Sequence, residues 1–178
     1  MAKQQTRVWA YVDVGWLLDG LSGQGMPWRL NYGALIDQLA GERTVVGKAA
    51  YMALFPGACY PNKEKDQQAL LDLMAEQGFE TKVCEMQVKG GMYLDLGVDL
   101  TLAVDMLEQG INDAYDTALV VSRRPTLRPA VEAVRRIGKE VENAFFEYVA
   151  DPSNEVKAAA NSFQPLTEQL VHDFASIN

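Results

Sequence analysis

Residues 119–129 read Leu-Val-Val-Ser-Arg-Arg-Pro-Thr-Leu-Arg-Pro, and this stretch decides the fold. The apolar residues at its start are typical of a strand that ends inside a protein core. Pro125 then marks a turn, because it has a fixed backbone angle and no amide hydrogen for a strand ladder. Apolar residues at helical spacing follow at residues 126–137. The stretch therefore predicts a buried strand that leads through a short turn into a helix, with Ser122 at the carboxyl end of the strand.

The same alternation of strand and helix runs through most of the chain. Runs rich in β-branched and aromatic residues predict strands at residues 7–14, 45–55, 79–88, 117–122 and 140–148. Helical spacing of apolar residues predicts helices at residues 31–40, 62–77, 98–109 and 126–137. Strands that alternate with helices favour right-handed crossovers. We therefore predict an α/β fold with an open, mostly parallel, twisted sheet of about five strands and helices on both faces.

The last part of the chain predicts a helical extension. The turn signal Asp-Pro-Ser-Asn begins at Asp151, and a short helix and then a last helix at residues 166–175 follow it. A length of 178 residues fits one compact domain of ordinary size. We therefore expect residues 1–178 to form a single domain whose C-terminal helices begin at about residue 151.

Residues that favour helix ends support these boundaries. Asn31 and Asn62 precede two helical runs, where an asparagine side chain accepts a hydrogen bond from the first turn. Gly78, Gly110 and Gly138 follow helical runs, where glycine ends a helix in left-handed geometry.

The charge of the chain limits how it binds nucleic acid. The net charge is −8 and the sequence pI is about 4.7, whereas proteins that coat nucleic acid are usually basic. Local charge differs, because one short segment collects six of the 16 lysines and arginines, namely Arg123, Arg124, Arg128, Arg135, Arg136 and Lys139. This segment fits either a solvated helix face or a phosphate-binding patch, and the sequence leaves both open.

The composition predicts neither a membrane anchor nor a disulfide framework. No apolar run approaches the ~20 residues that span a bilayer, and the first residues lack the apolar core of a signal peptide. Cys59 and Cys84 are isolated and lie in apolar segments, which favours buried, reduced thiols. We therefore expect a cytoplasmic protein that does not bind membranes.

Acidic residues mark a candidate site near the carboxyl ends of the strands. Asp13 ends the first strand, where side chains of a parallel sheet border the functional crevice. Asp99 begins a helix, whose exposed amides favour a carboxylate, so a purely helix-stabilising role also fits it. Asp105 lies well off the helix face of Asp99 and is a candidate supporting residue. Asp95 lies in the glycine-rich approach to the helix and is the weakest of these candidates.

Other kinds of catalytic site find little support in the sequence. His172 is the only histidine and lies in the predicted last helix, so a surface or capping role fits it better than a catalytic triad. The glycines at residues 20–25 and 90–91 lack the spacing of a phosphate-binding loop and predict mobile loops.

Asp13, Asp99 and the turn at residues 122–127 together resemble the NYN domain, in the LabA-like branch of the PIN-like ribonuclease superfamily. Asp13 matches the aspartate that follows the family's first strand, and Asp99 matches the aspartate of its lysine-glycine-valine-aspartate helix start. Residues 122–127 match its serine-glycine-aspartate-x-aspartate-phenylalanine turn. The resemblance continues outside the site, at residues 129–133, 138–142 and 160–163.

The departures from the family pattern gather in the site itself. Trp16 stands where the family has an asparagine, and Leu96 stands where it has a lysine. Arg124 and Thr126 stand where the family's turn has its two aspartates. The resemblance therefore implies the fold of a ribonuclease with two of its acidic positions replaced.

The resemblance also implies a chemistry, which is metal-dependent hydrolysis of RNA phosphodiesters. Clustered carboxylates hold Mg²⁺ or Mn²⁺ in such sites, and the ion activates water. In this chain the implied ligands that remain are Asp13 and Asp99. A guanidinium at Arg124 would take the place of the metal as the counter-ion of this acidic pair, so we expect no metal cofactor, or weak binding of Mg²⁺ or Mn²⁺.

Two functions remain open at this point. The first is a pseudonuclease that binds single-stranded or structured RNA, with phosphates at Ser122, Arg123, Arg124 and Arg128 and a base stacked on Trp16, Trp28 or Tyr93. The second is an active endoribonuclease with a reduced metal set, namely Asp13, Asp99 and Asp105, and with Arg124 stabilising transition-state charge. We favour the first, because the turn has lost its acids. A protein partner or a homodimer is also open.

Overall fold

A fully parallel sheet forms the centre of the molecule. The computed structural model describes residues 5–147 and 154–175. Six strands form the sheet in the order β3-β2-β1-β6-β7-β8, and every neighbouring pair runs parallel. Their bounds in this order are Glu80–Glu85, Thr44–Leu54, Arg7–Asp13, Thr117–Val121, Glu140–Phe145 and Ser162–Pro165. The predicted α/β fold with a mostly parallel sheet is confirmed.

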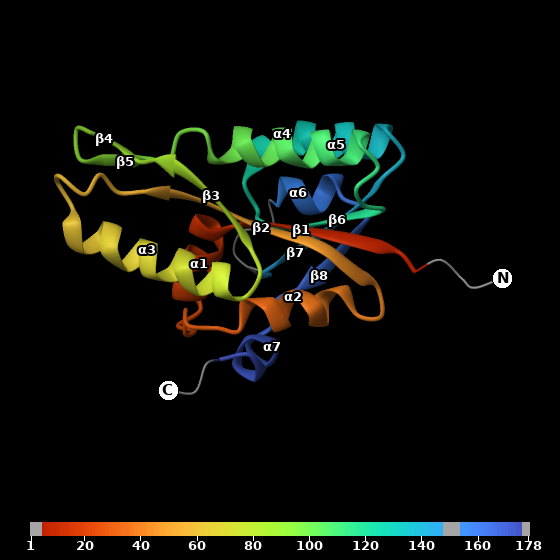
Figure 1. The fold of residues 1–178 in the computed structure, drawn as a ribbon, viewed down its shortest axis with the longest axis horizontal. Helices are drawn as coiled ribbons and strands as arrows, with labels where there is room; N and C mark the ends of the chain where they lie inside the picture. The colour runs from red at the N-terminus through yellow and green to blue at the C-terminus, as the bar shows by residue number, and fades with distance from the viewer. Residues whose placement is uncertain (1–4, 148–153, 176–178) are drawn as a thin grey trace.

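Helices cover both faces of this sheet, as predicted (Figure 1). One face packs against α1, α2, α3 and α7, which span Val14–Gly23, Tyr32–Ala40, Pro61–Glu76 and Glu168–Asp173. The other face packs against α4, α5 and α6, which span Val98–Ile111, Arg128–Arg136 and Glu155–Ala159. A separate cluster of buried apolar side chains fills each of the two interfaces. The central strands are apolar because both of their faces are covered.

The order of the strands reverses between β1 and β6. From β1 the chain builds outward through β2 to β3, and it then returns to the other side of β1 with β6, β7 and β8. In an open parallel sheet, the carboxyl ends of the strands beside such a reversal border a crevice. Asp13 ends β1 and Ser122 follows β6, so the topology places both residues at this point.

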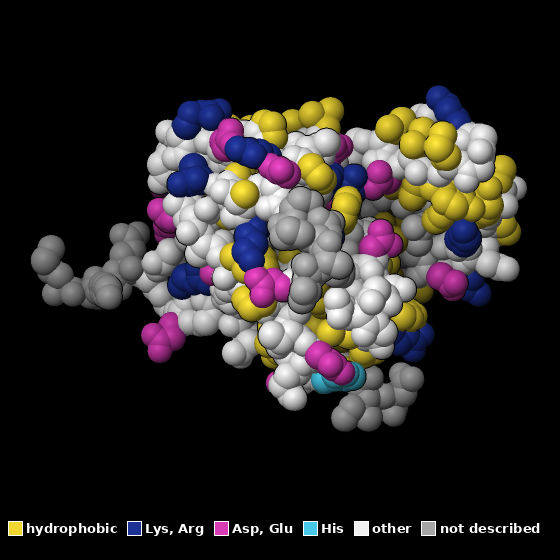
Figure 2. Space-filling model, turned by 180° about the vertical axis from the view of Figure 1, so that it is seen from behind, with side chains coloured by type: hydrophobic (Ala, Val, Ile, Leu, Met, Phe, Trp, Pro, Cys, Tyr) yellow, Lys and Arg dark blue, Asp and Glu magenta, His cyan; other side chains and the backbone are white. Residues whose placement is uncertain are grey.

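The predicted strand at residues 79–88 is wrong after Glu85. Only β3 belongs to the main sheet, and after Met86 the chain forms a separate antiparallel hairpin of β4, Gln87–Lys89, and β5, Met92–Leu94. Gly90 and Gly91 have φ values of 57° and 80°, which suit a tight hairpin turn. Hydrophobic side chains gather at this hairpin (Figure 2), where Tyr93 is exposed.

The C-terminal extension is not purely helical. The short helix α6 and the last helix α7 are both present, but β8 lies between them and pairs with β7 at the edge of the sheet. The sequence prediction missed β8 because it is short and half-exposed. The predicted strand end at Tyr148 and the predicted turn at residues 151–153 lie outside the described residues.

The helix α1 was not predicted, because its glycines suggested a loop. Gly20 lies inside this helix and is buried, so the loop prediction is wrong for this residue. A Cβ atom at Gly20 would lie 2.4 Å from the ring of Phe146. The glycine therefore permits close packing between α1 and the segment after β7.

The predicted helix starts are half right. The side chain of Asn31 accepts a hydrogen bond from the amide of Ala34 at 3.0 Å and caps α2, as predicted. The prediction for Asn62 is wrong, because α3 begins at Pro61 and Tyr60 precedes it without a side-chain cap. Proline suits the first position of a helix, since the missing amide hydrogen has no partner there.

The predicted helix ends hold for two of the three glycines. Gly78 and Gly138 have φ values of 84° and 86° and follow α3 and α5 in left-handed geometry. Gly110 instead lies inside α4, where a Cβ atom would meet the hydroxyl of Tyr115 at 2.9 Å. Close packing, rather than helix termination, explains this glycine.

Two sequence expectations concern the environment of the chain. Within the described residues, no helix is both long enough and apolar enough to cross a membrane. Both cysteines are free; Cys84 is partly buried, but Cys59 is exposed in the turn before α3, so the prediction of a buried thiol is wrong for it.

Candidate functional site at the carboxyl edge of the sheet

Asp13 is the fully buried centre of the site. Its side chain has no exposed surface, although it is a carboxylate at the end of a strand. Its Oδ1 accepts a hydrogen bond from the amide of Trp16 at 3.4 Å, so Asp13 also caps α1. The hydroxyl of Ser122 donates to its Oδ2 at 3.3 Å. These contacts join the ends of β1 and β6 across the switch point.

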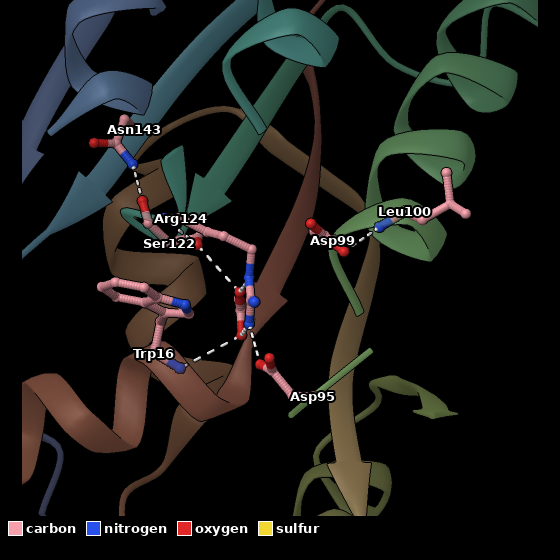
Figure 3. A network of polar contacts seen from close by, with 8 residues as sticks. Trp16, Asp95, Asp99, Leu100, Ser122, Arg124 and Asn143 are labelled. Atoms are coloured by element: carbon pink, nitrogen blue, oxygen red, sulfur yellow. Dashed lines mark hydrogen bonds and ion pairs between the residues drawn. The ribbon is translucent and has the colours of Figure 1, made fainter. Parts of the chain in front are cut away.

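Arg124 holds Asp13 to a second aspartate (Figure 3). Its Nε donates to Oδ2 of Asp13 at 2.7 Å, and its Nη2 lies 3.4 Å from Oδ1 of the same carboxylate. The same Nη2 donates to Oδ2 of Asp95 at 2.6 Å. The guanidinium thus bridges the two acids, and only 10% of the Arg124 side chain is exposed.

The hairpin that the sequence did not reveal positions Asp95. This residue directly follows β5, and the chain then turns through Gly97, whose φ is 93°, into α4. The turn points the Asp95 carboxylate at Arg124. Sequence reasoning ranked Asp95 lowest because it could not place the hairpin beside the end of β6.

A buried amide fixes the end of β6. Asn143 on β7 donates from its Nδ2 to the carbonyl oxygens of Val120 at 2.9 Å and Ser122 at 2.8 Å. Its own side-chain oxygen accepts a hydrogen bond from Asn154 at 3.0 Å. Ser122 in turn accepts the amide hydrogen of Arg124 at 3.1 Å. Asn143 was missed as a site residue, and its only sequence signal is an uncharged polar residue inside a buried strand.

The electrostatics of the site follow from burial. Removal from water raises the pKa of Asp13, and the hydrogen bonds from Arg124 oppose this rise. Burial acts to lower the pKa of Arg124, but its hydrogen bonds to Asp95 and Asp13 raise that pKa overall. Partial burial and the nearby charge of Asp95 also raise the pKa of Asp19 on α1. Arg124 is therefore the counter-ion of an acidic cluster.

The predicted acidic pair needs a correction. Arg124 points toward Asp13, as predicted, but its second partner is Asp95 and not Asp99. Asp99 lies on the first turn of α4, where its Oδ1 accepts the amide hydrogen of Leu100 at 2.9 Å. This is the helix-stabilising arrangement that the sequence left open for it.

Asp105 is engaged away from these residues. Its Oδ2 accepts a hydrogen bond from the hydroxyl of Tyr51 on β2 at 2.9 Å, and the ammonium of Lys82 on β3 lies 3.9 Å away. These contacts tie α4 to the sheet. They do not join Asp105 to the network around Asp13.

The predicted phosphate-binding residues fall into two groups. The guanidinium groups of Arg123 and Arg124 lie 5.8 Å and 5.9 Å from the ring centre of Trp16, in cation–π range. Arg128 belongs to the second group, because its side chain pairs with Glu132 at 2.9 Å and Glu155 at 2.5 Å and not with Trp16. Thr126, in the turn before α5, is exposed.

The other two aromatic candidates lie in separate places. Tyr93 packs with Phe55 and Tyr60, and the ammonium of Lys63 lies 4.4 to 5.4 Å from the three ring centres. Trp28 lines a cavity of about 480 Å³ between α1 and α3. Tyr93 lies near the site through its neighbour Asp95, whereas Trp28 lies apart from it.

The acids in the described part of the chain do not form a metal site. Across residues 5–147 and 154–175, no three histidine, cysteine, aspartate or glutamate side chains form a group that could hold a metal ion. Asp13 and Asp95 instead direct their oxygens at Arg124. A divalent cation would therefore have to displace a buried guanidinium.

The sequence profile of the NYN domain matches residues 13–167. The chain belongs to the NYN domain family. NYN domains are PIN-like domains of the nuclease type, so the resemblance read from the sequence is confirmed at the level of the family. The match begins at Asp13, the buried acid of the site.

Structural comparison supports the fold of this NYN domain. A crystal structure of a protein of unknown function from Vibrio parahaemolyticus superposes with a TM-score of 0.72, over 98% of each chain, at 19% sequence identity. A search of functionally curated proteins gives no match. The similarity at this identity concerns the fold.

Proposed function

We propose that this NYN domain is a pseudonuclease of the LabA-like branch that binds RNA at the carboxyl edge of its sheet without cleaving it. The observation that carries the proposal is the ion pair of 2.7 Å between the buried side chains of Arg124 and Asp13. A fixed positive charge beside the central carboxylate repels a divalent ion and uses the oxygens that would ligate it.

The aromatic and basic residues around the edge support a role in binding. Trp16 is partly exposed and lies under two guanidinium groups, an arrangement that suits both a base and a phosphate. Tyr93 keeps 49% of its surface exposed beside Lys63. A single strand that passes from Trp16 to Tyr93 would cross the switch point and follow the surface above Asp95.

The few basic residues at the edge limit the size of this contact. Arg123, Arg124 and Lys63 are the basic residues that we place along this edge, so the domain should neutralise only a few phosphates there and binding should depend weakly on salt concentration. Cytoplasmic action is also part of the proposal, and the two free cysteines are consistent with a reducing compartment. We further propose that residues 1–178 act as one domain.

RNA binding is tested with a fluorescently labelled single-stranded RNA. We expect Arg123→Ala to weaken binding at least several-fold, because it removes the guanidinium over Trp16. Arg136→Ala is the matched control, since it removes the same charge from an exposed position at the far end of α5 and should leave binding nearly unchanged. Equal affinities of the wild type and both variants would refute binding at this edge.

Loss of catalysis is tested on the same RNA with Mn²⁺. We expect the RNA to remain intact after incubation with the wild-type protein. Cleavage that Asp13→Asn abolishes would show that the active endoribonuclease is the correct alternative, because only a reaction at this site depends on that carboxylate.

A further inference from the structure

The helix α4 is apolar on two opposite sides. Its inner side packs on the sheet through the buried residues Val98, Leu102, Met106 and Gly110. Its outer side carries Leu100, Val104 and Ile111, which are 67%, 50% and 69% exposed. A surface helix normally keeps a polar outer side, whereas a helix that is hydrophobic all round is covered on both sides.

The exposed apolar surface continues beyond both ends of α4. Leu96, just before the helix, is 52% exposed, and Met92 on the hairpin is 64% exposed. At the other end Ile137 is 41% exposed, and it lies close enough to α4 that a Cβ atom at Gly110 would be 3.0 Å from its Cδ1. Figure 2, which views the molecule from behind, shows hydrophobic side chains gathered at the hairpin and a smaller group at the top edge. Exposed apolar side chains that gather on one part of a surface mark interaction sites.

The spacing of the outer residues is that of a helix-pairing seam. Leu100, Val104, Leu107 and Ile111 follow one another at intervals of four, three and four residues, which correspond to positions d, a, d and a of a heptad. Leu107 is half-buried, because it also packs against the apolar cluster between α4 and the sheet. Ala103 lies beside this seam, and its small side chain allows another helix to approach closely. The surface therefore fits a second helix with the same spacing.

We propose that the outer side of α4 binds α4 of a second copy of this chain, in antiparallel orientation about a two-fold axis. In this arrangement Leu100 packs against Ile111 of the second copy, and Val104 packs against Leu107 of the second copy. Each copy supplies both residues of each contact, so the surface is complementary to itself, as a two-fold interface requires. Antiparallel helices also place opposite ends of their dipoles together.

The charges around the seam favour the same occupant. The helix α4 contains Asp99, Asp105 and Glu108 but no lysine or arginine. The neighbouring helix α5 carries the exposed Arg136 in its last turn, and the next residue, Ile137, lies against the C-terminal end of α4. Arg135 of the same turn donates to the carbonyl oxygen of Ala159 on α6. Antiparallel pairing brings the acidic start of one α4 toward this basic end of the other copy. An acidic, apolar surface does not suit RNA, so the inference stands apart from the proposed function.

The oligomeric state in solution tests the inference. We expect sedimentation equilibrium to give the mass of a dimer for the wild type, and of a monomer for Leu100→Glu with Val104→Glu. Val83→Glu is the matched control, because Val83 is 53% exposed on β3, away from the α4 seam, and this variant should remain dimeric. Far-UV circular dichroism identifies any variant that fails to fold. A monomeric wild type, or a folded seam variant that stays dimeric, would overturn the proposal.

Cysteine cross-linking tests the orientation. In a Cys59→Ser background, which removes the exposed native thiol, we expect Leu100→Cys with Ile111→Cys to form a covalent dimer under oxidising conditions. The single Leu100→Cys variant should not form one, since its two copies lie at opposite ends of an antiparallel seam and a disulfide requires neighbouring Cα atoms. A covalent dimer of the single variant would contradict the antiparallel arrangement.

Discussion

At each end of β1, one arginine bridges two aspartates, yet the two sets differ in their environment. The set at the amino end consists of Arg7, Asp113 and Asp116, with ion pairs of 3.2 Å and 2.7 Å. The set at the carboxyl end consists of Arg124, Asp13 and Asp95, with ion pairs of 2.7 Å and 2.6 Å. At the amino end the three side chains are 28% to 72% exposed, whereas Asp13 at the carboxyl end is 0% exposed.

The difference shows which set is explained by stability alone. Exposed ion pairs cost little desolvation and contribute little to stability, so the amino-end set is an ordinary surface salt-bridge network. A buried ion pair loses several kcal/mol of hydration for each ion, and apolar residues of similar size would often be more stable there. The buried charges are placed at the switch point of the sheet, and we attribute their presence to the function of that site.

The largest expected effect comes from removing the buried cation. Arg124→Met should destabilise the protein by about 3–5 kcal/mol at neutral pH, because Asp13 would stay buried without a counter-ion. Denaturant unfolding measures this loss. Arg7→Met is the matched control at the exposed set and should lose much less. Equal losses in the two variants would remove the distinction between the two ends.

A second substitution should reverse much of that loss. Asp13→Asn added to Arg124→Met removes the uncompensated charge, while an asparagine still caps α1. We expect the double variant to recover about 1–3 kcal/mol relative to Arg124→Met, in a double-mutant cycle followed by urea unfolding. If the losses of unfolding free energy in the two single variants simply add up in the double variant, Arg124 does not stabilise the charge of Asp13.

The two ends should respond to acid with opposite signs. Hydrogen bonds from Arg7 lower the pKa of Asp116 in the folded protein to about 2. The contribution of Asp116 to stability is therefore fully present above the pKa of the unfolded chain, and it is lost as the pH falls toward the folded pKa. Burial raises the pKa of Asp13, so the folded protein takes up this proton before the unfolded chain does, and acid adds stability at that residue.

Unfolding as a function of pH separates the two contributions. Arg7→Met should flatten the loss of stability between about pH 4 and pH 2, because the Asp116 carboxylate then titrates near its ordinary pKa. Arg124→Met should become more stable, relative to wild type, as the pH falls from neutral toward about 4. A pH profile of Arg124→Met that runs parallel to wild type would contradict the assigned burial of the Asp13 charge.

The smallest expected effect is at Asp95. Asp95→Asn removes the outer partner of Arg124, which is 41% exposed, so we expect a loss of at most about 1 kcal/mol. Thermal unfolding measures it. A loss as large as that of Arg124→Met would show that Asp95, and not Asp13, is the main partner of the arginine.

The sequence was sufficient for the features that depend on local patterns. Alternating apolar runs predicted the parallel sheet and its helices, and the position of Asp13 at the end of a buried strand predicted its place at the carboxyl edge. Ser122 and Arg124 followed from the apolar run before them. These features are set by periodicity within one element and by the rule that strand ends share an edge.

The rest of the site depends on contacts between distant elements. Asp95 reaches Arg124 only because a hairpin of two three-residue strands turns the chain toward β6. Asn143 fixes Ser122 from a neighbouring strand, and a polar residue in a strand does not reveal its partner from the sequence. Gly20 suggested a loop, but its role is to admit the ring of Phe146, which lies far away in the sequence.

We propose that Arg124 takes the place of a metal ion, and the effect of Mn²⁺ on thermal unfolding tests this role most directly. Arg124→Asp places a third carboxylate beside Asp13 and Asp95, which repel one another unless a divalent cation enters. We expect millimolar Mn²⁺ to raise the melting temperature of Arg124→Asp by several degrees, and to leave the wild type and Arg124→Met nearly unchanged. A rise of the wild type as large as that of Arg124→Asp would contradict the account.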